Sequence, residues 1–265
     1  MSAELSPRLA GEARRQLRIC NACRYCEGYC SAFPAITRLR EFADADIARI
    51  ANLCHNCRGC YYACQYTAPH EFDLNLPAIL AEARRESWQG YIRPRALGRL
   101  FHTNGWATVA ATLAGFVLIW LAIRWLGGQE GGGGFYAALS HSAMVALFLP
   151  AFLLPLAGLG LGLAAFWREI GGRPLRRREI GAALAQAARL QDLSGGQGQG
   201  CNFERAERYS NARRHAHHAV LWGFLLCFAA TVAGTVMHYG LGQPAPYHLW
   251  SVPKLLGIPG GVLLL

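Results

Sequence analysis

Eight of the ten cysteines in this 265-residue chain stand in two short runs of identical spacing. Both runs read C-x2-C-x2-C-x3-C, and they consist of Cys20, Cys23, Cys26 and Cys30 and of Cys54, Cys57, Cys60 and Cys64. Thiols at such close intervals can form disulfides, bind zinc or bind an iron–sulfur cluster. The repeated spacing is the one used by cysteines that bind [4Fe–4S] clusters.

The presence of two runs predicts two clusters with shared ligands. In bacterial ferredoxins that hold two cubanes, the fourth cysteine of each run binds the cluster of the other run. Three closely spaced cysteines wrap three corners of a cube within one loop, whereas the fourth corner faces away from that loop. We therefore predict one [4Fe–4S] cluster on Cys20, Cys23, Cys26 and Cys64, and a second on Cys54, Cys57, Cys60 and Cys30.

Zinc and disulfides fit the two runs less well. A structural zinc site normally uses two ligand pairs separated by a longer loop, and a third cysteine two residues further on does not suit a single tetrahedral ion. Disulfides need an oxidising compartment. The first residues, MSAELSPRLAGEARRQ, are charged and lack the apolar core of a secretory signal.

The sequence around the runs predicts helices. Between them, apolar residues recur at mostly helical spacing, at Ile36, Leu39, Ile47, Ile50 and Leu53. Residues 75–100 continue as a basic helix and a proline-broken segment. We therefore expect residues 1–100 to form an α-helical, ferredoxin-like domain that holds the two clusters.

A strongly apolar region follows. Residues 106–126 are long enough to cross a bilayer, and Arg124 lies near the end of the stretch, where its side chain can reach the interface. Two further spans are predicted at 135–167 and 218–240, and a fourth begins near Lys254. The predicted fold class is thus all-α, with a transmembrane helix bundle of three complete spans and the start of a fourth over residues 101–265.

Two features of the apolar region leave questions open. The second span is longer than a minimal crossing, which fits an interfacial start, a tilt, or a bend at Pro150 or Pro155. Gly158 and Gly162 either let another helix approach closely or only make an apolar helix rich in glycine.

The sequence ends within the predicted fourth span. It stops on GVLLL without polar residues to close that span, so we expect a longer parent protein.

The distribution of positive charge predicts the orientation in the membrane. Of 26 lysines and arginines, 14 precede Trp106 and 10 lie in 168–214, whereas the 127–140 and 241–253 loops contain none. Loops rich in lysine and arginine remain in the cytoplasm. We therefore expect a multi-pass protein of the bacterial cytoplasmic membrane, with the cluster domain and the basic loop 168–214 in the cytoplasm. The net charge of +10 is then explained by the orientation of the protein in the membrane, and no nucleic-acid partner is predicted.

Histidines near the ends of the spans are candidate haem ligands. His141 and His238 are expected at the same depth on neighbouring helices, where two neutral imidazoles could hold a b-type haem. Alternatively, both are interfacial histidines in contact with headgroups. His217 and His218 are further candidates at the opposite end of the third span, as a polar helix end or with His102 as a partner. His218 and His238 lie about 30 Å apart along one helix and cannot share a haem.

Two further histidines and the other two cysteines are given smaller roles. His55 and His70 stand beside the second cysteine run and are expected to tune a cluster through hydrogen bonds. Cys201 is expected to be a plain loop thiol, and Cys227 a small apolar residue in the third span.

Several stretches beyond the cysteine spacing resemble one family. These are CRYCEGYC, NLCHNCRGCYYACQYTAPHEF, RRHAHHAVLWGFLLCFAAT and YGLGQPAPYHLWSVPKLLGIPGG, and together they extend from Cys20 to Leu265. The sequence resembles the tricarballylate utilization protein B family, also called citrate utilization protein B. Members of that family are longer at the C-terminus.

The resemblance implies an electron-transfer role. It implies a protein that reoxidises the reduced FAD of a partner tricarballylate dehydrogenase and passes electrons through [4Fe–4S] clusters and b haem to the membrane quinone pool. The eight motif cysteines would hold the clusters, and His141 and His238 the haem. The protein would then be the electron-transfer component of an oxidoreductase, and whether it counts as an enzyme in its own right stays open.

Two alternatives remain. A related quinone-linked carrier, of the heterodisulfide reductase or succinate dehydrogenase kind, would serve a different flavoprotein dehydrogenase. A membrane-bound redox or iron sensor would use the clusters for signalling and would need an output domain.

Overall fold

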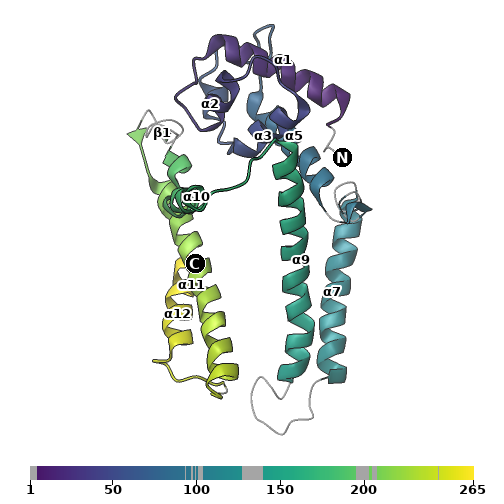
Figure 1. Cartoon of the computed structure of the whole chain (residues 1–265), viewed down its shortest axis with the longest axis vertical. Coiled ribbons are helices and arrows are strands. Elements are labelled where there is room, and N and C mark those ends of the chain that lie inside the picture. The colour runs from purple at the N-terminus through teal and green to yellow at the C-terminus, as the bar shows by residue number, and fades with distance from the viewer. Residues whose placement is uncertain are drawn as a thin grey trace. The chain divides into compact units, whose positions relative to one another are not determined.

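The protein is almost entirely helical. The computed structural model describes residues 5–92, 94–96, 98, 100, 104–126, 140–194, 203–204, 208–243 and 245–265. Figure 1 shows the helices, and the only strands in these described ranges are β1 (Phe203–Glu204) and β2 (Arg208–Tyr209), which pair antiparallel. The predicted all-α fold class is confirmed.

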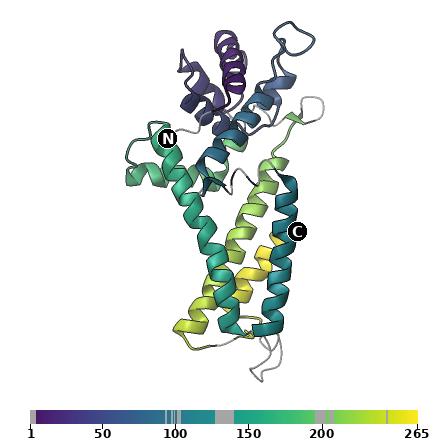
Figure 2. The same ribbon diagram turned by 90° about the vertical axis from the view of Figure 1, so that its right-hand side faces the viewer.

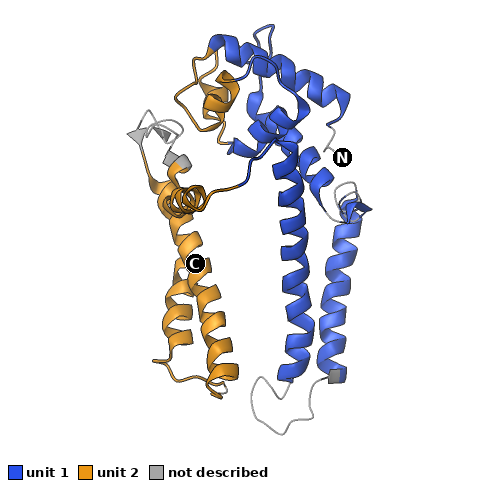
Figure 3. Ribbon diagram, viewed as in Figure 1, with its two compact units in different colours: residues 1–23, 39–56, 66–174 blue, residues 24–38, 57–65, 175–265 orange. Residues whose placement is uncertain are grey.

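The chain forms two compact units that alternate along the sequence, as Figure 3 shows. The first unit contains residues 1–23, 39–56 and 66–174, and the second contains residues 24–38, 57–65 and 175–265. The chain passes between the units inside both cysteine runs, so each run contributes residues to both units.

The globular part of the first unit is built on three helices. They are α1 (Pro7–Cys23), α3 (Asp44–Leu53) and α5 (Leu76–Tyr91), which contact one another. Its core contains Leu17, Ile47, Ile50 and Leu80, each at most 1% exposed. Burying one such side chain stabilises a fold by about 1.5–3 kcal/mol, so these four residues dominate the local packing.

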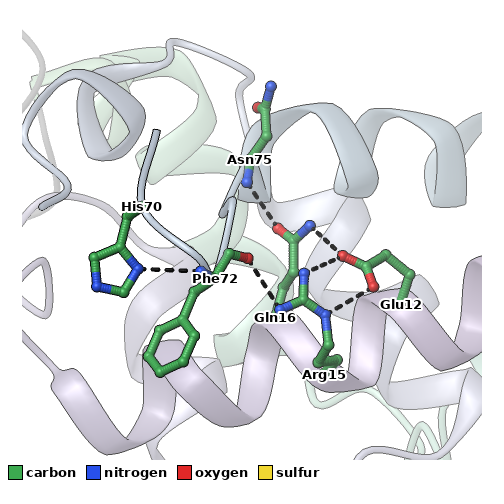
Figure 4. Close-up of polar contacts among 6 residues, drawn as sticks. All are labelled: Glu12, Arg15, Gln16, His70, Phe72 and Asn75. Atoms are coloured by element: carbon green, nitrogen blue, oxygen red, sulfur yellow. Dashed lines mark hydrogen bonds and ion pairs between the residues drawn. The ribbon is translucent and has the colours of Figure 1, made fainter. Parts of the chain in front are cut away.

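Polar contacts fix the chain where it leaves the second cysteine run (Figure 4). The Gln16 side chain, 4% exposed, donates to Glu12 and accepts from the backbone N–H of Asn75 at 3.1 Å. Arg15 donates to Glu12 and to the carbonyl oxygen of Phe72 at 3.0 Å. The hydrogen bond from Arg15 lowers the pKa of the Glu12 carboxyl group. These bonds tie α1 to the segment that precedes α5.

The segment between the cysteine runs is helical but broken. Its first part is α2 (Ala32–Thr37), and its second part is α3. Phe42, 2% exposed, anchors the intervening chain in the first unit, and Arg14 donates to its carbonyl oxygen at 2.9 Å. The carboxylate of Asp46 then accepts from the N–H of Ala43 and starts α3. The sequence predicted helix here correctly and did not predict the break.

Two long apolar helices complete the first unit. α7 (Gly105–Leu126) matches the predicted span over 106–126 within one residue. α9 (His141–Glu169) continues through Pro150 and Pro155 and begins at Ser140, whose hydroxyl accepts from the N–H of Ala143. The part of the predicted second span over 135–139 lies outside the described residues. The most apolar window of each helix is 0% buried in the protein, as expected for helices that meet lipid.

The second unit contains another apolar helix with a shorter one beside it. α11 (Ala212–Gly240) is long and apolar enough to cross a membrane, and α12 (Val252–Leu264) follows it. The two helices run side by side (Figure 2). A Cβ atom on Gly260 would lie 2.8 Å from the Cys227 sulfur and 2.9 Å from the Gly223 carbonyl oxygen. The expectation of a small residue at Cys227 agrees with this close contact.

The basic segment 168–214 is more structured than the sequence indicated. It contains the amphipathic helix α10 (Arg177–Arg189), the 3-10 turn η1 (Gln191–Ser194) and the two short strands. None of the residues of α10 is buried, and Leu184 is 66% exposed. Arg214 at the start of α11 donates to the carbonyl oxygen of Arg189 at 2.6 Å. The segment predicted as a basic loop thus contains helix and strand that the sequence did not predict, and its place in the cytoplasm stays a prediction.

Candidate functional site

The first cysteine run lies at the end of α1 and in the turn that follows. Cys20 and Cys23 belong to the last turn of the helix, and Cys23 is exposed. Cys26 is buried, and Cys30 is half-buried just before α2. Arg24 adopts a left-handed backbone conformation with φ of 56°, which turns the chain directly after the helix. Helix and turn thus present the four thiols over a short stretch of chain.

The second run begins where α3 ends. Cys54 caps α3, and the N–H of Asn56 donates to its sulfur at 3.4 Å. Asn56 and Arg58 both have left-handed backbones, with φ of 53° and 62°. Cys60 lies in the short helix α4 (Gly59–Tyr62). Left-handed backbones at residues other than glycine cost energy and gather at functional sites, so both runs have the strained, turning backbone of a ligand loop.

Arg84 holds the end of α3 in place. Its guanidinium donates to the carbonyl oxygen of Ala51 at 2.9 Å and also to the carbonyl oxygen of Cys54. A cation at the C-terminus of a helix satisfies its last carbonyl groups and interacts well with the helix dipole. Arg84 is therefore a positioning residue for Cys54. The sequence did not reveal it, because nothing distinguishes it there from the neighbouring Arg85.

The donor chemistry of the two runs suits iron–sulfur clusters. Eight thiols at matching spacing, turned backbones and an N–H donated to sulfur are features of cluster-binding loops. Among the described residues, however, no three His, Cys, Asp or Glu side chains stand close enough together to hold a metal ion. The assignment of particular cysteines to two clusters therefore stays a prediction.

The candidate haem ligands lie at helix ends. His141 begins α9 in the first unit, whereas His238 lies in the last turn of α11 in the second, with its ring 4.8 Å from that of Tyr239. Their pairing across one haem stays a prediction. His217 is exposed on α11, and His218 is half-buried. The Nε2 atom of His218 is buried and has no hydrogen-bond partner within the described parts of the chain.

The histidines near the second run have different surroundings. His70 accepts a hydrogen bond from the N–H of Phe72 at 3.1 Å (Figure 4). Its ring also packs against the rings of Tyr66 and Phe72. His55 is exposed beside Cys54. His102 and Cys201 lie outside the described residues. A role of His55 or His70 in tuning a cluster stays a prediction.

Comparison with known proteins gives the family. Residues 13–89 match the Citrate utilization protein B Fer4-like domain, and residues 100–265 match Citrate utilization protein B. The chain belongs to the citrate utilization protein B family. It is 43% identical over 258 residues to Citrate utilization protein B of Escherichia coli, across 96% of this chain and 68% of that protein. No solved structure matches it.

Family membership agrees with the chemistry of the site. Both cysteine runs fall within the Fer4-like domain, which indicates iron–sulfur clusters. The remainder of the match contains three helices that are long and apolar enough to cross a membrane. These findings are consistent with an iron–sulfur electron-transfer role for this member of the family.

Proposed function

We propose that the protein reoxidises the reduced FAD of a partner tricarballylate dehydrogenase and delivers the electrons, through two [4Fe–4S] clusters and b haem, to the membrane quinone pool. The observation that carries this proposal is the union in one chain of a Fer4-like domain with two complete cysteine runs and three apolar helices. A quinone dissolved in the bilayer can be met only by a carrier that is itself in the membrane.

The cysteine runs are proposed to hold the clusters in the reciprocal arrangement predicted from their spacing. Bound clusters would supply one-electron redox chemistry between a two-electron flavin donor and a quinone. The protein contributes the thiol ligands, the hydrogen bond from Asn56 to Cys54, and the clamp of Arg84 on the end of α3. Hydrogen bonds to cluster sulfurs are one of the ways in which a protein sets a reduction potential.

A b-type haem is proposed on histidines of the apolar helices. His141 with His238 remains the proposed pair because each stands at the end of a span. His217 and His218 remain candidates for a second or alternative site. The buried Nε2 atom of His218 supports it as a ligand, since a buried ring nitrogen without a partner is costly unless something binds it.

The orientation follows from charge. We propose that the cluster domain and residues 168–214 face the cytoplasm, where the reducing environment preserves thiolate-bound iron. The helix α10 carries Ile180 and Leu184 among its arginines and has no buried residue. It is therefore our candidate for part of the surface that docks the flavoprotein.

Reconstitution tests the proposal. The full-length chain would be incorporated anaerobically into lipid vesicles with a soluble quinone and a tricarballylate dehydrogenase whose FAD has been reduced by its substrate. We expect rapid flavin reoxidation with stoichiometric quinol formation, which requires both the chain and the quinone. Flavin reoxidation that is equally fast without the chain would overturn the proposal. Turnover with another flavoprotein dehydrogenase alone would instead support the quinone-linked alternative.

A further inference from the structure

An apolar pocket of about 440 Å³ lies within the first unit, between the end of α5 and the C-terminal half of α9. Asn52, Trp88 and Tyr91 line it from the globular part, and Leu159, Gly162 and Phe166 are among the residues of α9 that line it. Pockets of this size, largely apolar with a few polar groups, are the usual form of a small-molecule site. Nothing in the cysteine chemistry accounts for it.

The pocket depends on a close approach between the two helices. A Cβ atom at Gly162 would lie only 3.0 Å from the carbonyl oxygen of Tyr91, so only glycine fits there without movement of one of the two helices. Next to this contact, the rings of Tyr91 and Phe166 meet edge to face with their centres 5.4 Å apart. The packing fixes two walls of the pocket. The role of Gly162 in close packing is therefore toward α5, a contact that the sequence did not predict.

The Tyr91 hydroxyl is buried behind the pocket wall. Tyr91 is only 8% exposed, and its hydroxyl group lies beside the Glu169 carboxylate. Burial raises the pKa of the phenol well above its usual range, and the charge of Glu169 and a hydrogen bond to it raise the pKa further, so the hydroxyl keeps its proton. Tyr91 therefore presents its apolar ring to the pocket.

The other polar groups of the wall are already engaged. The Trp88 indole N–H donates to the side-chain oxygen of Asn52 at 2.8 Å, and the Asn52 amide donates to the carbonyl oxygen of Ala48 at 2.8 Å. The pocket therefore offers mainly apolar surface, with its polar side chains turned to other partners. This favours an apolar ligand over a charged or strongly polar one.

The pocket lies near a proposed cluster ligand and beside a helix that is apolar enough to cross a membrane. Asn52 precedes the cluster ligand Cys54 by two residues, so their Cα atoms lie within about 7.6 Å. On the opposite wall, Leu159 and Leu163 are each 60% exposed on a helix that is apolar enough to cross a membrane. A ligand could thus enter from lipid and reach the neighbourhood of a cluster ligand.

We propose that this pocket binds the head ring of a membrane quinone, with the ring between Tyr91 and Phe166 on one side and Leu159 on the other and the apolar tail lying along α9. This inference rests on the proposed function. Reduction of the quinone to the quinol would take two electrons, which originate from the reduced FAD and arrive singly through the carriers of the protein. It would also take two protons, which would come from water beside the globular part.

Photolabelling of the full-length protein in lipid vesicles tests the site without any turnover. An azidoquinone with a short tail would be cross-linked, and the labelled residues located by mass spectrometry. We expect labels within residues 88–92 and 154–166, removed by excess unlabelled quinone. Labels confined to other segments, or labels that phospholipid displaces and quinone does not, would overturn the proposal.

A matched pair of variants on α9 sharpens the test. Leu159 and Leu161 are 60% and 61% exposed, but only Leu159 lines the pocket. Leu159→Trp should fill the pocket and lower labelling about tenfold, as overfilling a formed site does. Leu161→Trp adds the same bulk outside the pocket and should leave labelling unchanged. Equal labelling of both variants at the wild-type level would contradict the assignment.

Quinone-driven reoxidation of the dithionite-reduced protein separates this inference from the proposed function. If quinone oxidises the wild-type protein and the Leu159→Trp variant equally fast, the function stands and the pocket is wrong. If the pocket is labelled but quinone oxidises neither protein, the function fails and the binding site stands.

Discussion

Large apolar side chains are buried in the globular helices of the first unit and exposed on its long apolar helices. Leu17, Ile47 and Ile50 in the globular part are 0% exposed, whereas Leu154 on α9 is 71% exposed and Trp125 on α7 is 83% exposed. The globular part is an ordinary core that excludes water. The long helices have no such core in the protein itself, and lipid is the solvent that explains their surface.

This difference in burial also explains where the candidate cluster and haem ligands lie. Each cysteine run begins at the end of a helix of the globular part, α1 or α3, where the bonds of Gln16 and Arg84 fix the backbone. The histidines sit at the ends of α9 and α11. A globular part that positions thiols and apolar helices that reach lipid are complementary requirements for moving electrons from a soluble donor into a membrane.

The largest effect is expected from the loss of one motif cysteine. Cys57→Ser should remove one cluster, lowering the iron content from about eight to about four per chain, and should block flavin reoxidation. Iron and sulfide analysis and the visible spectrum measure this. Cys227→Ser changes a thiol in the α11–α12 contact and should keep both clusters. Full iron content and turnover in the Cys57→Ser protein would contradict the assignment.

A pair of core and surface truncations tests the contrast in burial. Ile47→Ala removes a fully buried side chain and should lower the free energy of unfolding by about 3 kcal/mol. Leu154→Ala removes a side chain that is 71% exposed and should cost less than about 0.5 kcal/mol in detergent. Thermal unfolding of the purified chain compares them. Similar losses in both variants would mean that α9 packs against protein there.

Two adjacent glycines of α12 should respond in opposite directions. A Cβ at Gly260 would meet the Gly223 carbonyl oxygen at 2.9 Å, whereas a Cβ at Gly261 would meet nothing within 4 Å. Gly260→Ala should therefore destabilise the α11–α12 pair by about 1–3 kcal/mol. Gly261→Ala should be neutral or stabilise by up to about 1 kcal/mol through helix propensity. Thermal unfolding of each variant measures the effect, and destabilisation of equal size would refute the close contact.

The hydroxyl of Tyr91 should make stability depend on pH. Burial and the Glu169 carboxylate raise its folded-state pKa, so its contribution to stability is complete below about pH 10 and declines above it. Tyr91→Phe keeps the ring contact with Phe166 and should lose this part of the decline. Denaturant unfolding of both proteins at about pH 7 and about pH 11 measures the difference. An equal decline in both proteins would contradict the raised pKa.

The smallest effect is expected at the Glu12–Arg15 pair. Both side chains are well exposed, so Glu12→Gln should lower the free energy of unfolding by less than about 1 kcal/mol. The lowered pKa of Glu12 means that its contribution is present above its unfolded pKa and is lost as the pH falls through the folded value. Acid titration of the two proteins measures the difference. If Glu12→Gln still lowers the free energy of unfolding at low pH, the effect comes from the contact with Gln16 and not from the charge of Glu12.

The sequence predicted those parts of the fold that depend on local pattern. The span over 106–126 matches α7 because apolar length alone defines a bilayer crossing. The break between α2 and α3 escaped prediction because it depends on the burial of Phe42 by distant residues. Helix α10 was not predicted, because Ile180 and Leu184 are its only large apolar side chains and mark its apolar face weakly.

The sequence likewise identified some residues of the candidate site and missed others. The motif cysteines could be identified from spacing, since the ligand geometry of a cubane is local in the chain. Arg84 and Tyr91 could not be identified, because their roles depend on contacts with Cys54 and with α9 that are distant in sequence. The paired histidines stay a prediction, since His141 and His238 belong to different units.

The most direct test of the account is the metal content and the paramagnetism of the anaerobically purified full-length chain. We predict about eight iron atoms and matching acid-labile sulfide per chain, with signals of two interacting reduced [4Fe–4S] clusters after dithionite treatment. Zinc in place of iron, or a fully reduced sample without any paramagnetic signal, would contradict it.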